Sequence, residues 1–423
     1  MSLLGLYRLA TRMAGPVLPA YLRRRARAGK EFPWAMSERF GTSTEKHRPD
    51  GRLVWMHGAS LGETGALFPL VERLLGDDKD LSVLLTYQTT SAANVVADRI
   101  AKPTYSGRVQ SVFAPLDTPK AVRAFFDHWR PDAAVFAESE IWPNLLLEMK
   151  ARRVPAALVN ARMNAASLHR WERRRRAAQT LLGAFEVILA ADRPTAKGLS
   201  SLLGRDVETT GNVKFSALPP PAEPARLEAL RRRLSGRAVV AALSVHPEEM
   251  GFFRDFAESL PPGPGGEPGL LLLYPRYPDR LQDYGIDDTV PGNVADRDLR
   301  PKDRLFLHAG FGDTALVCEV ARCAVMGGSF RPELKGHNPV EALALGLPVA
   351  SGAHVASFAG VYADWYGRLG TDWAGALERV PGWLEDDALL ARDRDRALAF
   401  AAERRGVIDR VMERLAPLLK DLA

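Results

Sequence analysis

Short apolar runs alternate with longer amphipathic stretches along the first half of the chain, and the same rhythm returns in the second half. The runs of the first half are RLVWMH (52–57), LSVLLTYQTT (81–90), VQSVFAPL (109–116), DAAVFAESE (132–140), VPAALVNAR (154–162) and FEVILAA (185–191). Those of the second half are AVVAALSVHPEE (238–249), GLLLLYPRYPDR (269–280), CAVMGGSF (323–330) and LPVASGAH (347–354). Strands that alternate with helices form parallel sheets. The pattern therefore predicts an α/β protein with two parallel-sheet domains, a ligand cleft between them, and functional loops at the carboxyl ends of the strands.

A proline-rich stretch separates the two halves. SALPPPAEPAR, residues 216–226, interrupts the alternation, and prolines at such a density are typical of a semi-rigid linker. We therefore predict a first domain over 31–215 and a second over 227–385. Residues 386–423 are charged and amphipathic, which predicts C-terminal helices.

Apolar and basic residues are mixed in the first thirty residues. A spanning helix needs about 20 mainly apolar residues, but Arg8, Arg12, Pro16 and Pro19 interrupt this stretch. It also lacks the features of a signal peptide, which has a short charged start, an unbroken apolar core and a cleavage site of small residues. We predict that residues 1–30 lie in a membrane interface, with a solvated helix as the alternative. The side chains expected to face anionic headgroups are Arg23, Arg24, Arg25, Arg27 and Lys30.

Composition narrows the function classes further. The net charge of +6 favours an anionic partner, but the basic clusters lack interleaved stacking aromatics, so binding to nucleic acid is not expected. Cys318 and Cys323 lack the paired spacing of a zinc site or a disulfide framework. No Asp-x-Asp pair directly follows an apolar run, so neither a metal nor any other cofactor is expected.

The stretch HGASLGETGA, residues 57–66, follows the first apolar run and permits two interpretations. Ser60 and Glu63 have the spacing of a capping box, in which a hydroxyl and a glutamate satisfy the free N–H groups at a helix start. Glu63 is also a candidate catalytic base, because it follows the carboxyl end of a predicted strand. The position in a first helical turn is expected to favour the ionised carboxylate.

A second helix start is predicted in the second domain. MGGSFRPELKGHNPVEALALG, residues 326–346, passes from a strand through Gly327, Gly328 and Ser329 and enters a helix capped by Asn338. The free N–H groups of a helix start favour a phosphate, and Glu341 is well placed for a ribose hydroxyl. The pattern is typical of a nucleotide-sugar site, although ordinary turn chemistry also explains the two glycines.

The order of ten short motifs along nearly the whole chain resembles the 3-deoxy-D-manno-octulosonic acid (Kdo) transferases of lipopolysaccharide synthesis. The motifs are ERFG (38–41), HGASLGE (57–63), PLDTP (115–119), ESEIWPN (138–144), LVNARM (158–163), GNVKF (211–215), SVHPEE (244–249), PRYPDR (275–280), GGSF (327–330) and GHNPVEA (336–342). The resemblance implies a GT-B glycosyltransferase with two Rossmann-like domains. Its donor would be CMP-Kdo, held by the second domain, and its acceptor a lipid A precursor, met by the first. The expected location is the cytoplasmic face of the bacterial inner membrane.

The resemblance also implies roles for residues of the first domain. Glu63 would be the general base of an inverting transfer, since such a reaction needs a carboxylate to take the proton of the attacking hydroxyl. Ser60 and Gly62 would lie on the acceptor side. Glu138 or Glu140 would assist at the reacting centre, with the choice between them open, and Lys214 would stabilise the departing phosphate or the Kdo carboxylate.

Donor binding would fall to residues of the second domain. On the resemblance these are Pro275, Arg276, Gly327, Gly328, Ser329, His337, Asn338, Pro339, Val340 and Glu341, with His246 in a secondary role. Gapless alignment of AGFGDT, residues 309–314, with a different family motif would place Phe311, Gly312 and Asp313 at the CMP. This departure, and Tyr277 and Asp279 in PRYPDR, leave open a different CMP-activated ulosonic acid or acceptor. A non-catalytic membrane-bound descendant is the third alternative.

Overall fold

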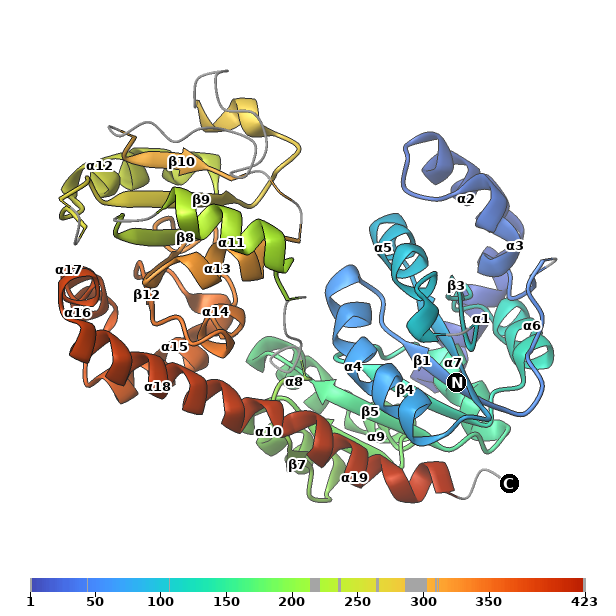
Figure 1. The fold of residues 1–423 in the computed structure, drawn as a ribbon. Coiled ribbons are helices and arrows are strands. Elements are labelled where there is room, and N and C mark those ends of the chain that lie inside the picture. The colour runs from blue at the N-terminus through green and yellow to red at the C-terminus, as the bar shows by residue number, and fades with distance from the viewer. Residues whose placement is uncertain are drawn as a thin grey trace. The chain divides into compact units, whose positions relative to one another are not determined.

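The computed structural model describes residues 2–43, 45–105, 107–213, 221–234, 237–263, 266–285, 303–308, 310 and 312–420. The chain forms two compact units, one of Met1–Ala217 with Arg405–Ala423 and the other of Leu218–Arg404. Each unit is a parallel sheet covered by helices (Figure 1). The prediction of two parallel-sheet α/β domains is therefore confirmed.

The sheet of the first unit has the strand order β3-β2-β1-β4-β5-β6-β7, and all its pairs are parallel. The strands are β1 (Arg52–His57), β2 (Leu81–Tyr87), β3 (Val109–Phe113), β4 (Ala133–Ala137), β5 (Ala156–Ala161), β6 (Val187–Ala190) and β7 (Glu208–Thr209). The first six lie within the predicted apolar runs, whereas the two-residue β7 was not predicted. The direction in which strands are added reverses between β1 and β4. At such a reversal, loops leave neighbouring strands on opposite faces and leave room for a ligand.

Both faces of this sheet are buried, because successive side chains of a strand point to opposite sides. Val54 and Met56 pack on one face, and Leu53 and Trp55 pack on the other. The first face is covered by α4 (Leu61–Asp77), α5 (Thr90–Ile100) and α19 (Val407–Lys420), and the second by α6 (Pro119–Trp129), α7 (Pro143–Ala151), α9 (Arg175–Leu182) and α10 (Arg193–Leu203). A further helix, α8 (Ala165–Glu172), precedes α9.

The last helix, α19, belongs to the first unit although the whole second unit precedes it in the sequence. Its apolar stripe joins the core with Val407, Val411, Leu415 and Leu418. Polar contacts hold it to the sheet edge, where Arg414 Nε pairs with Glu208 Oε2 of β7 at 2.7 Å. The predicted C-terminal helices therefore exist, but α18 (Asp387–Arg405) lies in the second unit and α19 in the first.

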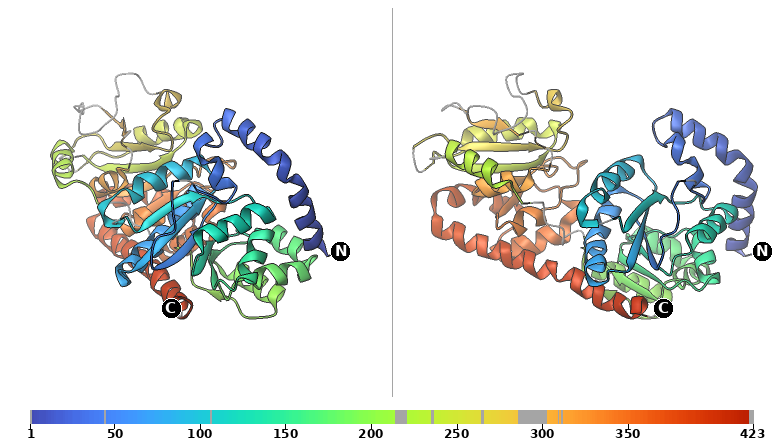
Figure 2. Two further views of the ribbon diagram at one scale, coloured as in Figure 1. Left: turned by 90° about the vertical axis from the view of Figure 1, so that its right-hand side faces the viewer. Right: turned by 45° about the vertical axis from the view of Figure 1, so that its right-hand side comes forward.

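Helix α1 (Leu3–Ala14) packs against α6 and α7 of the first unit, and α2 (Leu18–Arg27) follows it along the chain (Figure 2). The polar side of α1 faces the unit: the Tyr7 hydroxyl donates to Asp117 Oδ2 at 2.9 Å, and Thr11 Oγ1 accepts from Asn144 at 3.0 Å. Leu4 packs against the core, whereas the other large apolar side chains of α1 are exposed, namely Leu3, Leu6, Leu9 and Met13, followed by Val17 and Tyr21. Within the described residues, no helix combines the length and the apolar character needed to cross a membrane.

A short α-helix, α3 (Met36–Arg39), lies between α2 and β1 in the sequence.

The second unit has a sheet of the order β10-β9-β8-β11-β12, again parallel throughout. The strands are β8 (Val239–Val245), β9 (Leu270–Pro275), β10 (Leu305–Leu307), β11 (Cys323–Met326) and β12 (Val349–Ser351). Its strand order also reverses once, between β8 and β11. Four strands coincide with predicted runs, and the three-residue β10 was not predicted.

The helices of the second unit are α11 (Pro224–Arg233), α12 (Met250–Ser259), α13 (Thr314–Val320), α14 (Val340–Ala344), α15 (Ala359–Leu369), α16 (Trp373–Glu378), α17 (Val380–Glu385) and α18. Two differences from the predictions concern helix starts. The last three residues of the predicted linker, 224–226, begin α11, while 214–220 lie outside the described residues. Helix α14 begins at Val340, one residue later than predicted, although Asn338 Oδ1 accepts from the Val340 N–H at 3.0 Å as a capping side chain does.

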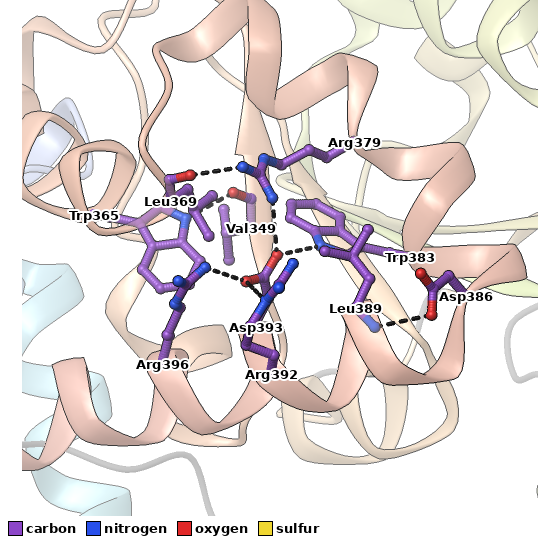
Figure 3. A network of polar contacts seen from close by, with 10 residues as sticks. All are labelled: Val349, Trp365, Leu369, Arg379, Trp383, Asp386, Leu389, Arg392, Asp393 and Arg396. Atoms are coloured by element: carbon purple, nitrogen blue, oxygen red, sulfur yellow. Dashed lines mark hydrogen bonds and ion pairs between the residues drawn. The ribbon is translucent and has the colours of Figure 1, made fainter.

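A buried carboxylate joins the last helices of the second unit (Figure 3). Asp393 of α18 has no exposed surface, and its Oδ2 accepts from Trp383 Nε1 at 2.9 Å and from Arg379 Nη1 at 3.3 Å. Its other oxygen accepts from Arg396 Nη1 at 2.8 Å. A buried charge is tolerated only when it is paired and hydrogen-bonded, so Asp393 ties α18 to the end of α16 and to α17.

Replacement of this carboxylate should destabilise the second unit. Asp393→Ala leaves the Trp383 N–H and the Arg379 guanidinium without their acceptor, so we expect a loss of about 3 kcal/mol in the free energy of unfolding. Asp395→Ala is the matched control, since Asp395 is exposed on the same helix, and its effect should stay within about 0.5 kcal/mol. Urea unfolding of both variants measures the difference. Equal stability of the two variants would show that the Asp393 network is not stabilising.

Candidate active site

The first candidate site lies at the carboxyl ends of β1 and β4, where the strand order of the first unit reverses. The chain leaves β1 at His57 and turns at once into α4. The turn is so tight that a Cβ atom on Gly58 would lie 2.8 Å from the backbone of Glu63. The predicted capping box is present: Ser60 Oγ accepts from the Glu63 N–H at 3.4 Å, and Glu63 Oε2 accepts from the Ser60 N–H at 3.1 Å. Gly62, in the same first turn, is exposed.

The capping box fixes Glu63 but does not make it a weak base. Burial raises the pKa of Glu63 above its ordinary value, the negative charges of Glu140 and Glu138 raise it further, and the hydrogen bonds with Ser60 oppose the shift. The expectation that the helix start would favour ionisation is therefore corrected, because burial and neighbouring carboxylates outweigh it. A half-buried carboxylate with a raised pKa is a stronger proton acceptor than one in water.

The two glutamates after β4 have different surroundings. Glu138 has a left-handed backbone with φ of 61°, and its Oε1 accepts from the Asn160 amide at 3.5 Å. Asn160, at the end of the neighbouring β5, is also left-handed with φ of 53°, and its Oδ1 accepts from the Val213 N–H at 3.1 Å. Strained backbone of this kind persists only where the surrounding contacts hold it. Hydrogen bonds of the Asn160 side chain thus hold both Glu138 and Val213 in place.

Glu140 is instead held by two aromatic N–H donors. His57 Nε2 lies 3.1 Å and Trp142 Nε1 2.6 Å from the same oxygen, Glu140 Oε2. Burial acts to raise the pKa of Glu140, but these hydrogen bonds and the electrostatic attraction of His57 outweigh it and hold the pKa below its ordinary value. The structure therefore brings together Glu63, Glu138 and Glu140, with the pKa of Glu63 raised and the pKa of Glu140 lowered. Lys214, the fourth predicted catalytic residue, lies outside the described residues.

The second candidate site lies at the equivalent reversal in the second unit, at the carboxyl ends of β8 and β11. A buried carboxylate organises it: Glu249 Oε2 accepts from the Gly328 N–H at 2.7 Å, and Oε1 accepts from the Phe330 N–H at 3.0 Å. The same Oε2 accepts from the His246 N–H at 3.1 Å. Glu249, in the loop after β8, therefore fixes the backbone of the loop after β11. That loop contains Gly327 and Gly328 and is called the glycine loop below. We did not predict this role, although His246 and Glu249 have capping-box spacing.

A pair of histidines closes one side of the glycine loop. His246 Nε2 and His337 Nε2 lie 2.7 Å apart and their rings stack at 5.0 Å. A Cβ atom on Gly328 would come within 2.5 Å of the His337 ring, so only glycine fits, and its φ is 68°. Burial lowers the pKa of His337 to about 4, with the charges of His246 and Arg276 acting in the same direction. Arg276, exposed just beyond Pro275 at the end of β9, is thus close to the pair.

Two other predicted donor residues serve the fold internally. A Cβ atom on Gly327 would lie 2.6 Å from Ser244 O, so β8 and the glycine loop touch through their backbones. Ser329 is fully buried, and its hydroxyl donates to Met326 O at 2.5 Å and accepts from the Gly352 N–H at 2.8 Å. The side chain of Ser329 therefore links the ends of β11 and β12.

The loop after β10 holds Asp313 in an ion pair rather than leaving it open. Arg226 of α11 contacts both its oxygens, at 3.0 and 2.8 Å, and His308 Nε2 lies 2.9 Å from Oδ2. Burial acts to raise the pKa of Asp313, but these partners hold it below its ordinary value. Gly312 is left-handed with φ of 80°, and Phe311 lies outside the described residues.

The remaining predicted residues lie around α14. Pro339 and Val340 are buried, while Asn338 is partly exposed beside His337. Glu341 is partly buried in the first turn, and burial raises its pKa. These four residues adjoin the glycine loop in space as well as in sequence, because Gly336 N donates to Gly328 O at 2.7 Å.

Comparison with known proteins decides the family. Residues 35–217 match the family model described as 3-deoxy-D-manno-octulosonic-acid transferase (kdotransferase). The 3-deoxy-D-manno-octulosonic acid transferase of Bordetella pertussis is 30% identical over 95% of this chain and 97% of its own. The chain belongs to the Kdo transferase family. The corresponding Haemophilus influenzae enzyme is 28% identical over 91% of each chain.

Solved structures place this Kdo transferase family member in a known fold. Anabaena Alr3699/HepE in complex with UDP covers 86% of the chain at 15% identity with a TM-score of 0.56. The UDP-GlcNAc 2-epimerase of Neisseria meningitidis also covers 86%, at 11% identity with a TM-score of 0.51. At these identities the likeness concerns the fold alone. The predicted GT-B fold of two Rossmann-like domains is confirmed.

The histidine pair makes this Kdo transferase family member sensitive to acid. Because the pKa of His337 is about 4 in the folded unit and about 6.5 in an unfolded chain, the unfolded chain binds more protons between these pH values. Stability of the second unit should therefore be fully present above pH 6.5 and fall as pH decreases toward 4. NMR titration of the His337 ring measures the pKa directly, and urea unfolding measures the slope. His337→Gln should flatten that slope, and an ordinary pKa for His337 would contradict the burial argument.

Proposed function

We propose that the protein is an inverting glycosyltransferase that moves Kdo from CMP-Kdo to a hydroxyl of a lipid A precursor in lipopolysaccharide biosynthesis, with Glu63 as general base. Membership of the Kdo transferase family supports the reaction class. The observation that supports the mechanism is the position of Glu63 at the strand reversal, fixed by the capping box and raised in pKa beside Glu140.

The proposed reaction needs one base and one site for a leaving phosphate. The acceptor oxygen forms a bond to the anomeric carbon of Kdo while its proton passes to the Glu63 carboxylate. The bond between that carbon and the CMP phosphate breaks, and the electron pair leaves with CMP. Glu63 Oε2 is already engaged by the Ser60 N–H, so Oε1 is the oxygen proposed to receive the proton.

The second unit is proposed to bind the donor. Arg276 is exposed at the end of β9, where a guanidinium can bind a phosphate through two parallel hydrogen bonds. Asn338 and Glu341 are proposed for the ribose, and Lys214 for the departing phosphate or the Kdo carboxylate.

A second candidate function is transfer of a different CMP-activated ulosonic acid, or transfer to a different acceptor. The ion pair of Asp313 with Arg226 favours this alternative, because a carboxylate so engaged has few lone pairs left for a nucleotide. Incubation with CMP-Kdo and tetraacyl disaccharide 4'-phosphate, followed by mass spectrometry of the lipid, separates the two candidates.

The N-terminal helices are proposed to rest on an anionic membrane surface, at the cytoplasmic face of the bacterial inner membrane. Helix α1 turns Tyr7, Thr11 and Leu4 toward the protein, and it leaves Leu3, Leu6, Leu9 and Met13 exposed together with Arg8 and Arg12. Helix α2 adds a basic last turn with Arg24, Arg25 and Arg27. Apolar side chains beside clustered arginines are typical of helices that lie in a membrane interface.

Removal of the proton acceptor should abolish transfer without abolishing donor binding. Glu63→Gln keeps the size of the side chain and much of the cap, so we expect kcat to fall by at least about 10²-fold. Binding of CMP, measured by calorimetry, should change less than about twofold, since it is assigned to the other unit. Unchanged turnover of the Glu63→Gln enzyme would refute the mechanism. An equally large loss of CMP binding or of thermal stability would return Glu63 to a purely structural role.

Polar substitution of the exposed apolar side chains should weaken membrane binding. Point variants are preferable to deletion because α2 also contributes Leu22, which is fully buried. The combined variant Leu6→Ser, Leu9→Ser and Met13→Ser should lower the affinity for anionic vesicles by at least about tenfold. High salt should lower it in the unmodified protein by screening. Leu398→Ser, at a comparably exposed leucine of α18, is the control. Full vesicle binding by the triple variant would exclude this surface.

A further inference from the structure

A chain of hydrogen bonds runs from the core of the first unit to Glu140. Trp55 Nε1 lies 2.8 Å from Thr86 Oγ1, and the same Oγ1 lies 2.8 Å from His57 Nδ1. The other ring nitrogen, His57 Nε2, lies 3.1 Å from Glu140 Oε2. Trp55 and His57 have no exposed surface, nor does Thr86. Three adjacent strands therefore supply the chain, because β1 lies between β2 and β4 and pairs His57 with Thr86.

The chemistry of the donors assigns the protons along this chain. An indole N–H only donates, so Thr86 Oγ1 accepts from Trp55. The Thr86 hydroxyl proton is then available for His57 Nδ1, which accepts it. A neutral imidazole that accepts at one nitrogen carries its proton on the other. His57 therefore donates from Nε2 to Glu140.

The hydrogen-bond chain ends at Glu140 Oε2, an oxygen that accepts from two N–H donors. Besides His57, the Trp142 indole N–H donates to Glu140 Oε2 at 2.6 Å. Two N–H donors on one oxygen stabilise the ionised form and leave no proton for that oxygen to carry. Glu138 instead meets a neutral amide, since its Oε1 accepts from Asn160 at 3.5 Å. The two glutamates thus differ in the donors that the fold directs at them.

We propose that His57 is a positioning residue that holds Glu140 ionised beside Glu63, and that Glu140 rather than Glu138 is the second acidic group at the reacting centre. The proposal rests on the proposed function of Glu63 as a base. The negative charge of Glu140 disfavours a second carboxylate anion nearby and so increases the affinity of Glu63 for the proton of the acceptor. His57 contributes indirectly, because without its N–H the buried Glu140 would gain a proton and lose that charge.

Few charged or titratable groups influence the pKa values of Glu63 and Glu140. Among the described residues, the titratable groups that shift the pKa of Glu63 are Glu140 and, more weakly, Glu138. The titratable group that shifts the pKa of Glu140 is His57, with Trp142 as a neutral donor. Removal of His57 and removal of Glu140 should therefore both move the acidic side of the pH profile to lower pH, because each leaves Glu63 beside a neutral group.

The test compares pH profiles of kcat for paired variants. In His57→Leu, Glu140 loses its donor and gains a proton, so the charge beside Glu63 is lost and the acidic limb should move to lower pH by about one unit, with kcat reduced about tenfold to a hundredfold. In Glu140→Gln the charge beside Glu63 is removed, and the acidic limb should move to lower pH. His57→Gln should restore a limb near the original position, because the amide N–H of glutamine replaces the Nε2–H. KM for the donor should stay within about twofold in all three variants.

Each outcome has a distinct meaning. A His57→Leu enzyme with an unshifted acidic limb overturns the positioning role, and a Glu138→Gln limb that shifts more than that of Glu140→Gln overturns the choice of glutamate. If His57→Leu does not fold, Trp142→Phe takes its place, since it removes the other donor to the same oxygen from a loop outside the core; it should shift the limb in the same direction. No shift in that variant overturns the proposal.

A spectroscopic measurement separates this proposal from the proposed function. In protein labelled with nitrogen-15 at histidine, long-range proton–nitrogen correlation at pH 8 should show His57 as the Nε2–H tautomer. Thr86→Ser, which keeps the hydroxyl, should retain that tautomer. The opposite tautomer in the unmodified protein overturns the proposal even if Kdo transfer is observed. The expected tautomer without any Kdo transfer refutes the proposed function alone.

Discussion

Each sheet of this protein reverses its strand order once, and the positions of Glu63, Glu140 and Glu249 follow from that constraint. A right-handed crossover between parallel strands places the next helix on one face, so a chain that first adds strands in one direction and then in the other opens a gap above the starting strand. In the first unit this gap lies between β1 and β4, and in the second between β8 and β11. Residues distant in sequence, such as His57 and Glu140, meet there because their strands are neighbours.

The two gaps hold chemically different groups. The first unit holds carboxylates at its reversal. Two N–H donors stabilise the ionised form of Glu140, and the pKa of Glu63 is raised. The second unit gathers a glycine loop, neutral histidines and an exposed arginine around one buried carboxylate, Glu249. A base is suited to the first environment and an anionic ligand to the second. The same topology therefore places chemically different groups at the two strand reversals.

Sequence reasoning predicted the elements and the order of the motifs, but not the contacts that decide each side chain's state. Fully buried strands have continuous apolar runs, so ten strands were predictable, while β7 and β10 are too short to have a pattern. The capping box of Ser60 and Glu63 was predictable because both residues lie within one turn. The roles of His57 and Glu249 were not, since their partners are 83 and 79 residues away. Asp313 is a further example of a distant partner. Alignment with the family motif predicted a contact with the nucleotide, but the ion pair of Asp313 with Arg226 of α11 could not be predicted from the sequence.

The return of α19 to the first unit has a consequence for synthesis of the chain. Val407, Val411 and Leu415 belong to the same core cluster as Val54 and Met56 of β1. A ribosome that has released only the first unit's contiguous residues has therefore exposed a sheet face that stays partly uncovered until α19 has been synthesised. The second unit, by contrast, is contiguous from Leu218 to Arg404 and can fold as soon as it emerges. In this protein the part that begins first is completed last.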